Sequence, residues 1–264
     1  MYEAYWGLNW APFQNVPDPL SFCPLPTRQE ILERLIYVIQ YGKGAALLTG
    51  DGGCGKSLLS RVLISHLDAA HYDIGLVINP SVPADELLYD IALQLGITPP
   101  TAQRSVLFRA LYEHLLANAQ AERSTVLIVD EAQTIQDKMV FDDLRMLLNF
   151  QLNERYPLTL ILLGQPGLQE LIPQQRELDQ RLAMHLHLDH LSATETASYI
   201  AFRLQAAGST KRIFTDTAIQ AIYQESQGIP RRINNLCDLC LFEGMRAQVQ
   251  EVESALVKMI LAFT

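Results

Sequence analysis

The sequence predicts an α/β fold, a doubly wound and largely parallel sheet, followed by an all-helical C-terminal lid domain. Three observations lead to this prediction. A glycine-rich turn at residues 50–57 stands between an apolar run and a helical pattern. Unbroken apolar runs alternate with helical patterns up to about residue 188, which is typical of a parallel sheet buried on both faces. From Ser192 onward only helical periodicity remains.

Length and composition indicate a globular protein that does not span a membrane. The chain has 264 residues, of which 49% are hydrophobic, and a net charge of −9. No apolar run approaches the ~18 to 20 residues that cross a bilayer, and the first residues lack the features of a secretory signal. We therefore expect a cytoplasmic protein. The net negative charge gives no overall basic surface of the kind that nucleic-acid-binding proteins carry, which disfavours nucleic acid as a partner.

Residues 1–26 combine several aromatic residues with five prolines. The prolines preclude a long helix because each fixes φ and removes a backbone donor, and the aromatic residues argue against disorder. We predict an ordered N-terminal extension over 1–26, laid along the main domain. A sheet domain over 27–190 and a helical lid domain over 191–264 complete the predicted organisation.

The elements after the extension alternate between helix and strand. The sequence from Thr27 to Glu30 has the form of a capping box and predicts the start of a helix. Strands are predicted at 45–49, 74–78, 125–129, 158–163 and 184–188, and further helices at 85–95, 106–116 and 142–152. A second capping box, from Ser192 to Glu195, opens four helices that continue to the end of the chain.

The glycine-rich turn has the pattern of a phosphate-binding P-loop, G-x-x-x-x-G-K-[ST]. Glycine lets the backbone turn its N–H groups inward around phosphate oxygens, and the following helix aims its positive end at them. A lysine between the β- and γ-phosphates and a hydroxyl on Mg²⁺ complete such sites. The predicted nucleotide-binding residues are Gly50, Asp51, Gly52, Gly53, Cys54, Gly55, Lys56, Ser57 and Leu58.

Two acids, Asp130 and Glu131, directly follow the apolar run at 125–129. Acids are costly at the end of a buried strand unless a positive group lies there, and a bound Mg²⁺ supplies that charge. We predict that Asp130 and Ser57 hold the metal, and that Glu131 is the base that orients and polarises the attacking water. The alternative is a pair of solvated acids at the start of a loop.

Cys237 and Cys240 form a lone C-x-x-C within a helical pattern. A zinc site needs four ligands, and no second pair stands at the required spacing. We therefore expect two buried thiols of a helix here, without a metal or redox role.

Several blocks together resemble AAA+ ATPases, and most closely the general secretion pathway A (ExeA/GspA-like) group. The blocks occur in the family's order over nearly the whole chain. They are Tyr5-Trp6-Gly7-Leu8, the P-loop, Asp130-Glu131-Ala132-Gln133, Gly164-Gln165-Pro166 and the run from Gly228 to Asp238. The resemblance implies Mg²⁺-dependent ATP hydrolysis in an oligomer, either a ring or a filament. The N-terminal extension then either only packs or covers the adenine.

The resemblance also implies roles for single polar residues. Asn79 is similar to the residue that restrains the catalytic glutamate in AAA+ proteins, and Gln165 to sensor 1, although many relatives have Asn or Thr there. Arg231 resembles the sensor 2 arginine, with Arg232 as an adjacent competitor.

An arginine finger, which acts on the nucleotide of a neighbouring subunit, is also implied. Arg181 is the first candidate for it and Arg176 the second. The alternative for each of these arginines is an ordinary surface ion pair, which contributes little to stability.

Two biological roles remain open. The resemblance implies an ATPase that helps to assemble a secretion or pilus system. The alternative is an ATP-dependent DNA-binding regulator, similar to the transposition ATPases related to the Mu B protein, whose partners are DNA and a transposase. Phosphate contacts in the second case would come from basic residues of the lid domain, namely Lys211, Arg212, Arg203 and Arg246.

Overall fold

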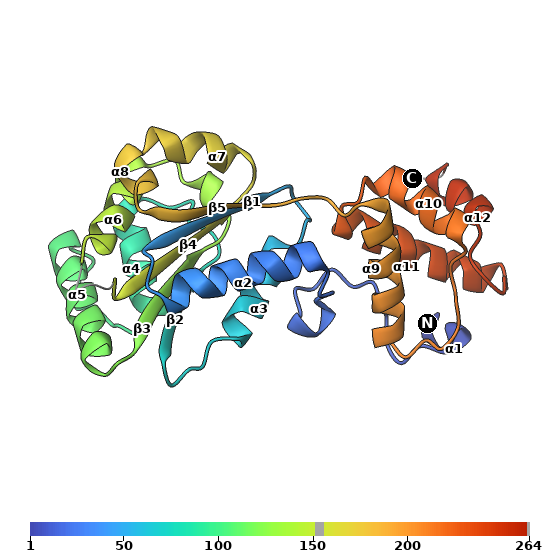
Figure 1. Cartoon of the computed structure of the whole chain (residues 1–264), viewed down its shortest axis with the longest axis horizontal. Coiled ribbons are helices and arrows are strands. Elements are labelled where there is room, and N and C mark those ends of the chain that lie inside the picture. Colours follow the sequence, from blue (N-terminus) through green and yellow to red (C-terminus); the bar gives the residue numbers. More distant parts are fainter. Residues whose placement is uncertain (151–155, 263–264) are drawn as a thin grey trace. The chain divides into compact units, whose positions relative to one another are not determined.

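The computed structural model describes residues 1–150 and 156–262 (Figure 1). The chain divides into two compact units. The sheet unit comprises residues 27–51 and 56–188, and the helical unit comprises residues 1–26, 52–55 and 189–264. Each unit is therefore built from more than one stretch of the chain.

The sheet unit contains five parallel strands in the order β2-β3-β4-β1-β5. Their bounds are Ala45–Gly50 for β1, Tyr72–Val77 for β2, Ser124–Val129 for β3, Leu158–Gly164 for β4 and Leu182–Leu188 for β5. The predicted α/β fold with a parallel sheet is confirmed. Because all strands are parallel, the segments that follow β1, β3 and β4 leave the sheet at the same edge.

Alternate strand residues are buried on both faces of the sheet. Residues 45 and 47 of β1, 127 and 129 of β3, and 160 and 162 of β4 share one apolar core. Helices α4 (Ala84–Gln94), α5 (Arg104–Gln120) and α6 (Lys138–Leu148) cover that face. The intervening residues point to the other face, where α3 (Lys56–Ser65) contacts β1 and β4. Burial on both sides explains why these strands read as unbroken apolar runs.

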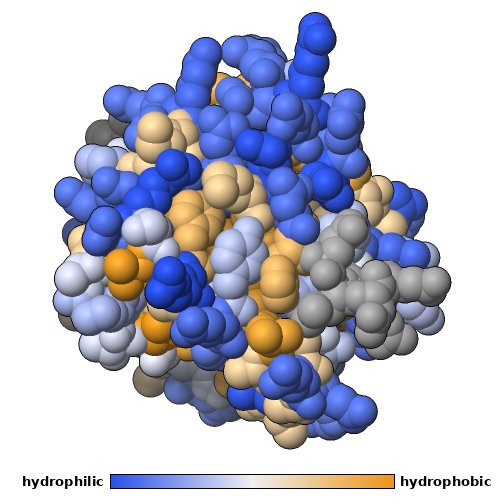
Figure 2. All heavy atoms as spheres, turned by 90° about the vertical axis from the view of Figure 1, so that its left-hand side faces the viewer, coloured by the Kyte–Doolittle hydropathy of each residue, from blue (hydrophilic) through white to orange (hydrophobic). Residues whose placement is uncertain are grey.

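The remaining elements of this unit frame the sheet (Figure 1). They are α2 (Pro26–Gln40), the single turn η2 (Ala132–Thr134), and the succession α7 (Gly167–Leu171), η3 (Ile172–Gln174) and α8 (Arg176–Asp179) that leads into β5. Figure 2 views the unit from the end where α5, α6 and α8 lie. Hydrophilic side chains predominate on that surface around a smaller apolar area, as expected for amphipathic helices that bury their apolar faces.

Two predicted helix starts differ from the structure. Helix α2 begins at Pro26, so Thr27 is its second residue and not the residue that precedes the helix. Proline suits the first position because its fixed φ is already helical and it has no N–H to satisfy. Helix α6 was predicted at 142–152 but begins at Lys138, because the Asp137 carboxylate accepts a hydrogen bond from the Met139 N–H at 2.9 Å. Residues 151 and 152 of that prediction lie outside the described residues.

The helical unit contains four main helices. They are α9 (Ala193–Ala206), α10 (Asp216–Ser226), α11 (Pro230–Arg246) and α12 (Ser254–Leu261), with the short α1 (Glu3–Trp6) and η1 (Pro19–Ser21) from the N-terminal segment. The capping box at Ser192 is confirmed, since its hydroxyl accepts from the Glu195 N–H at 3.2 Å and its own N–H donates to the Glu195 carboxylate at 2.9 Å.

The N-terminal segment belongs to the helical unit, so the expectation that it lies along the sheet domain was wrong. Its aromatic residues enter the apolar core formed by α9 to α12, and the Trp6 indole donates to the Leu241 carbonyl at 2.8 Å. Arg203 is 6% exposed, and its guanidinium donates to the carbonyls of Pro12 at 2.7 Å and Gln14 at 3.0 Å. These contacts hold in place a segment whose prolines disfavour regular helix or strand.

The two helix cysteines are buried and reduced, as expected. Burial raises the pKa of the Cys240 thiol to about 12 and raises that of Cys237 as well. Both thiols are therefore protonated and unreactive at neutral pH. Across residues 1–150 and 156–262, we find no helix with the length and apolarity needed to cross a bilayer.

Candidate nucleotide-binding site

A hydroxyl and a carboxylate meet at the edge of the sheet where β1 and β3 end. The Ser57 hydroxyl, on the first turn of α3, donates to Asp130 Oδ2 at 2.6 Å. Asp130 follows β3, is 3% exposed, and donates its backbone N–H to the Val77 carbonyl at 2.8 Å. Two hard oxygen donors thus lie together at the positive end of a helix. This is the ligand chemistry that Mg²⁺ prefers.

The described residues hold no group of three or more His, Cys, Asp or Glu side chains that could bind a metal by themselves. Ser57 and Asp130 can therefore hold a cation only together with water or ligand oxygens. Mg²⁺ is commonly bound in this way, through one or two protein ligands and substrate phosphates. The pair fits the predicted metal role.

Lys56 extends over the first residues of the loop. Its ammonium group donates to the carbonyls of Gly50 at 2.7 Å and Asp51 at 3.1 Å, and the residue is 5% exposed. A buried ammonium group beside a helix N-terminus makes this spot strongly positive. Its position is suited to an anionic ligand. Leu58, next along α3, is only partly buried.

The middle of the loop, residues 52–55, groups with the helical unit. Gly53 and Gly55 have φ of 88° and 101°, conformations that side chains other than glycine rarely adopt. The Gly53 carbonyl accepts from the backbone N–H of Arg231 at 3.2 Å, at the start of α11. Within this unit, the predicted sensor 2 arginine therefore stands directly beside the predicted phosphate loop. Cys54 is buried and Gly52 is exposed.

Glu131 is held by a residue for which the sequence predicted no role. The Gln133 carboxamide donates from Nε2 to Glu131 Oε2, and its Oε1 accepts from the Gln165 N–H at 2.9 Å. Gln133 thus joins the predicted base to the end of β4, where sensor 1 is expected. Glu131 itself has a φ of 55°, in the left-handed region. A non-glycine residue in that region is uncommon and marks a position that its surroundings fix.

The predicted restraint of the catalytic glutamate by Asn79 stays a prediction. Asn79 follows β2, is exposed, and its Oδ1 accepts from the Ser81 N–H within its own loop at 3.4 Å. Among the described residues, the side chain that donates to the Glu131 carboxylate is Gln133. The sequence block Asp-Glu-Ala-Gln contains Gln133, but its sequence does not indicate a bond to the glutamate. That bond depends on the single turn η2, which brings the Gln133 side chain back to Glu131.

Arg181 lies at the opposite edge of the sheet. Its carbonyl accepts from the N–H of Ala45, the first residue of β1, at 3.2 Å, whereas the P-loop follows the last residue of that strand. Six residues of parallel strand separate the two edges by about 18 Å. The guanidinium donates to the Tyr156 hydroxyl at 2.8 Å and to Asn149 Oδ1 at 2.9 Å. Arg181 is therefore remote from its own P-loop.

Comparisons with known proteins identify the family of the chain. The model of the "AAA domain" family matches residues 39–172, just over half of the chain. General secretion pathway protein A of Aeromonas hydrophila is 38% identical over 244 residues, which cover 91% of this chain and 44% of that protein. The chain thus spans less than half the length of that relative.

Solved structures share the fold at low identity. The ORC1 protein of Aeropyrum pernix, solved in complex with DNA, superposes with a TM-score of 0.71 at 18% identity, over 95% of this chain and 68% of that one. The Holliday junction branch migration motor RuvB of Thermotoga maritima gives a TM-score of 0.61 at 19% identity, over 89% and 69%. These likenesses establish the P-loop fold alone. The matching family model and the 38% identical relative show that the chain belongs to the AAA-domain family and is an ATPase of the general secretion pathway A type.

Proposed function

We propose that this protein binds ATP with Mg²⁺ at residues 50–58, hydrolyses it within an oligomer, and uses the cycle to drive assembly in a secretion or pilus system. The observation that carries the proposal is the 2.6 Å contact between the Ser57 hydroxyl and the Asp130 carboxylate, beside the buried Lys56 ammonium. A cation and a polyphosphate would each find complementary groups there. Bound Mg²⁺ would neutralise charge on the phosphate oxygens.

Three residues of the chain would carry out the remaining steps of ATP hydrolysis. Glu131 would accept a proton from the attacking water and orient it, because its carboxylate is fixed by Gln133 rather than by a cation. Gln165 begins the segment after β4, and its exposed side chain is available to a γ-phosphate. Arg231 would report the nucleotide state to the helical unit, since its backbone already contacts the loop at Gly53.

Arg181 would complete the site of a neighbouring subunit. It lies at the opposite edge of the sheet from its own P-loop, so any action on a phosphate has to occur in trans. Phosphoryl transfer needs positive charge on the equatorial oxygens, and an arginine supplied in trans contributes ~10³ to 10⁵ in rate in well-studied cases. The isolated subunit should accordingly be a poor ATPase.

The role in secretion or pilus assembly is supported by the likeness to general secretion pathway protein A. The DNA-binding alternative needs basic side chains of the helical unit that can reach phosphates. Three of the four residues predicted for it already bond to groups of this chain. Arg203 is buried against the N-terminal segment, and the other two form ion pairs, Arg212 with Asp216 and Arg246 with Glu243. Binding of duplex DNA at low salt that requires ATP would nevertheless favour the alternative.

The nucleotide site is tested by titration and turnover with and without Mg²⁺. Lys56→Ala should abolish ATP binding, because the loop loses its positive charge. Glu131→Gln should bind ATP with unchanged affinity and hydrolyse it slowly, because only the base is lost. Full turnover by Glu131→Gln would show that another group activates the water.

The trans arrangement is tested by mixing two inactive variants. Glu131→Gln subunits lack the base but keep Arg181, and Arg181→Ala subunits lack the arginine but keep the base. Activity in the mixture above that of either variant alone is expected, because some neighbours then share one complete site. If no ratio of the two variants gives activity, Arg181 does not act in trans.

For the biological role, Glu131→Gln expressed beside the wild-type protein should block export in a host that depends on it. Mixed oligomers would trap ATP and stall. Normal export with the variant present in excess would argue against a role in secretion.

A further inference from the structure

Helix α6 contacts the segment that carries Arg181 at two separate points. Arg145 Nη1 forms an ion pair with the Glu177 carboxylate of α8 at 2.9 Å. One turn further on, Asn149 Oδ1 accepts a hydrogen bond from Arg181 Nη2 at 2.9 Å. The residues from 176 to 181 are therefore fastened to α6 near both of their ends.

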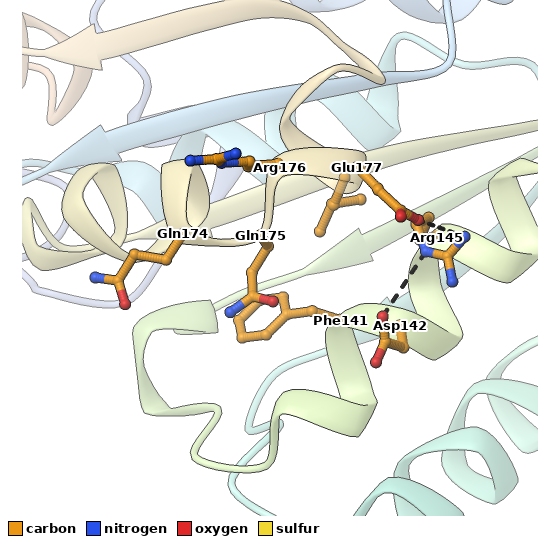
Figure 3. Close-up of a pocket in the computed structure, with 8 residues that line it drawn as sticks. Phe141, Asp142, Arg145, Gln174, Gln175, Arg176 and Glu177 are labelled. Carbon is orange, nitrogen blue, oxygen red and sulfur yellow. Dashed lines mark ion pairs between the residues drawn. The ribbon is translucent and has the colours of Figure 1, made fainter.

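Figure 3 shows the first of these points. Glu177 points toward Arg145, which also lies 3.8 Å from Asp142, while Arg176 points in the opposite direction, away from α6. Gln175 descends toward Phe141, and these residues line a pocket of about 310 Å³ between α6 and α8. The orientation separates the two finger candidates: the Arg181 guanidinium is held in place, whereas that of Arg176 is exposed and points outward.

The second point has the features of a positioning contact. Asn149 is exposed, and it caps α6 only through its backbone N–H. Its side chain is therefore not needed for the helix end, and in the described part of the chain its carboxamide oxygen is bonded to Arg181 alone. Tyr156 completes the arrangement, with its hydroxyl 2.8 Å from Arg181 Nη1 and its ring 5.9 Å below the guanidinium. A planar guanidinium held by two acceptors and a ring has little freedom to rotate.

The other end of α6 reaches the nucleotide edge. The helix is the crossover between β3 and β4, so it runs back from the carboxyl edge of the sheet to the amino edge. It begins at Lys138, seven residues after Glu131, and its 11 residues span about 16 Å. One rigid element thus extends from the loop that carries the predicted base to the residue that holds the predicted finger.

We propose that Asn149 is a positioning residue, which with Tyr156 orients Arg181 for the nucleotide of a neighbouring subunit, and that the Arg145–Glu177 pair fixes this segment on α6. The inference deepens the proposed function and depends on Arg181 acting in trans. In this proposal α6 holds the finger at one end, while its other end follows the loop that carries the subunit's own catalytic base.

The mixture of Glu131→Gln and Arg181→Ala subunits tests this proposal directly, because only the Glu131→Gln subunit donates an arginine. Asn149→Leu in that donor should lower the mixed activity roughly three- to tenfold, because a hydrogen bond exposed to solvent contributes less than a shielded bond to a charged group. The same Asn149→Leu in the Arg181→Ala subunit should change nothing, because that subunit has no finger to orient. Asn149→Asp in the donor keeps an acceptor oxygen and should retain the activity.

A merely structural role predicts a different pattern. If Asn149→Leu lowers activity equally in either subunit, or in neither, the positioning role is wrong although the trans finger stands. If the starting mixture has no activity, the trans finger fails and this proposal with it. Gln180→Ala in the donor is the matched control, since it shortens the exposed side chain next to Arg181 without touching the guanidinium, and it should leave the mixed activity unchanged.

Discussion

The hydrogen bonds of Gln133 allow a quantitative prediction for catalysis. Gln133→Leu keeps the size of the side chain but removes the donor to Glu131 and the acceptor for the Gln165 N–H. A hydrogen bond to a charged group contributes about 1.5 to 3 kcal/mol. Because each 1.36 kcal/mol changes a rate tenfold, turnover should fall roughly ten- to hundredfold if that energy serves to hold the base. ATP affinity should stay the same, since Gln133 bonds to Glu131 and Gln165, whereas Lys56 bonds to Gly50 and Asp51.

The assay is steady-state ATP turnover at saturating Mg²⁺-ATP, with affinity measured separately by equilibrium titration. Gln169→Leu is the matched control, because Gln169 also donates from its carboxamide to a side chain of the sheet unit, Thr49 Oγ1 at 2.6 Å, but has no bond to Glu131. Turnover of the control should be near that of the wild type. Wild-type turnover by Gln133→Leu, or a parallel loss of affinity and turnover, would refute the reasoning.

Two further predictions concern the stability of the helical unit. Gly228→Ala should lower the free energy of unfolding by about 2 to 4 kcal/mol, because Gly228 has a φ of 75° and an added Cβ would lie 1.9 Å from the Leu191 carbonyl oxygen. Chemical denaturation measures this change. The control is Gly167→Ala, where no atom lies within 4 Å of the added Cβ and stability should change by less than about 0.5 kcal/mol. Equal losses for the two variants would show that overlap with the Leu191 carbonyl is not the cause. Arg203→Met should release the N-terminal segment, because two of its carbonyls lose their donor, and limited proteolysis should then cleave within residues 10–20. The exposed Arg246→Met is the control, and equal resistance of the two variants to protease would show that Arg203 does not anchor the segment.

Much of the fold could be predicted from the sequence, because a parallel sheet buried on both faces leaves unbroken apolar runs. Strands β1, β3 and β4 follow from such runs, and the four C-terminal helices follow from helical periodicity. Helix starts were harder to predict, since Pro26 and Asp137 each supply a start signal that competes with the pattern further along. The place of residues 1–26 could not be predicted, because aromatic residues reveal that they pack but not against what.

The candidate site shows the same division. Residues of the P-loop and the Asp130–Glu131 pair are contiguous in the sequence, and their geometry follows from the strand and helix that flank them. The role of Gln133 depends on β3 and β4 being neighbours in the sheet, and that of Asn149 on the path of α6 to the opposite edge. Such contacts between distant segments have no local signature. The expectation for Asn79 came from family resemblance alone, and in the structure its bond stays within its own loop.

The discontinuous make-up of the helical unit has a consequence for biosynthesis. Tyr2, Trp6 and Phe13 leave the ribosome more than two hundred residues before Leu241 and Val257, which belong to the core that buries them. These aromatic side chains must wait for more than two hundred residues of translation before they can be covered, whereas the sheet unit can close on residues that lie between. An exposed aromatic segment on a growing chain is a natural site for chaperone binding, and removal of α11 and α12 would leave the aromatic residues of 1–26 permanently uncovered.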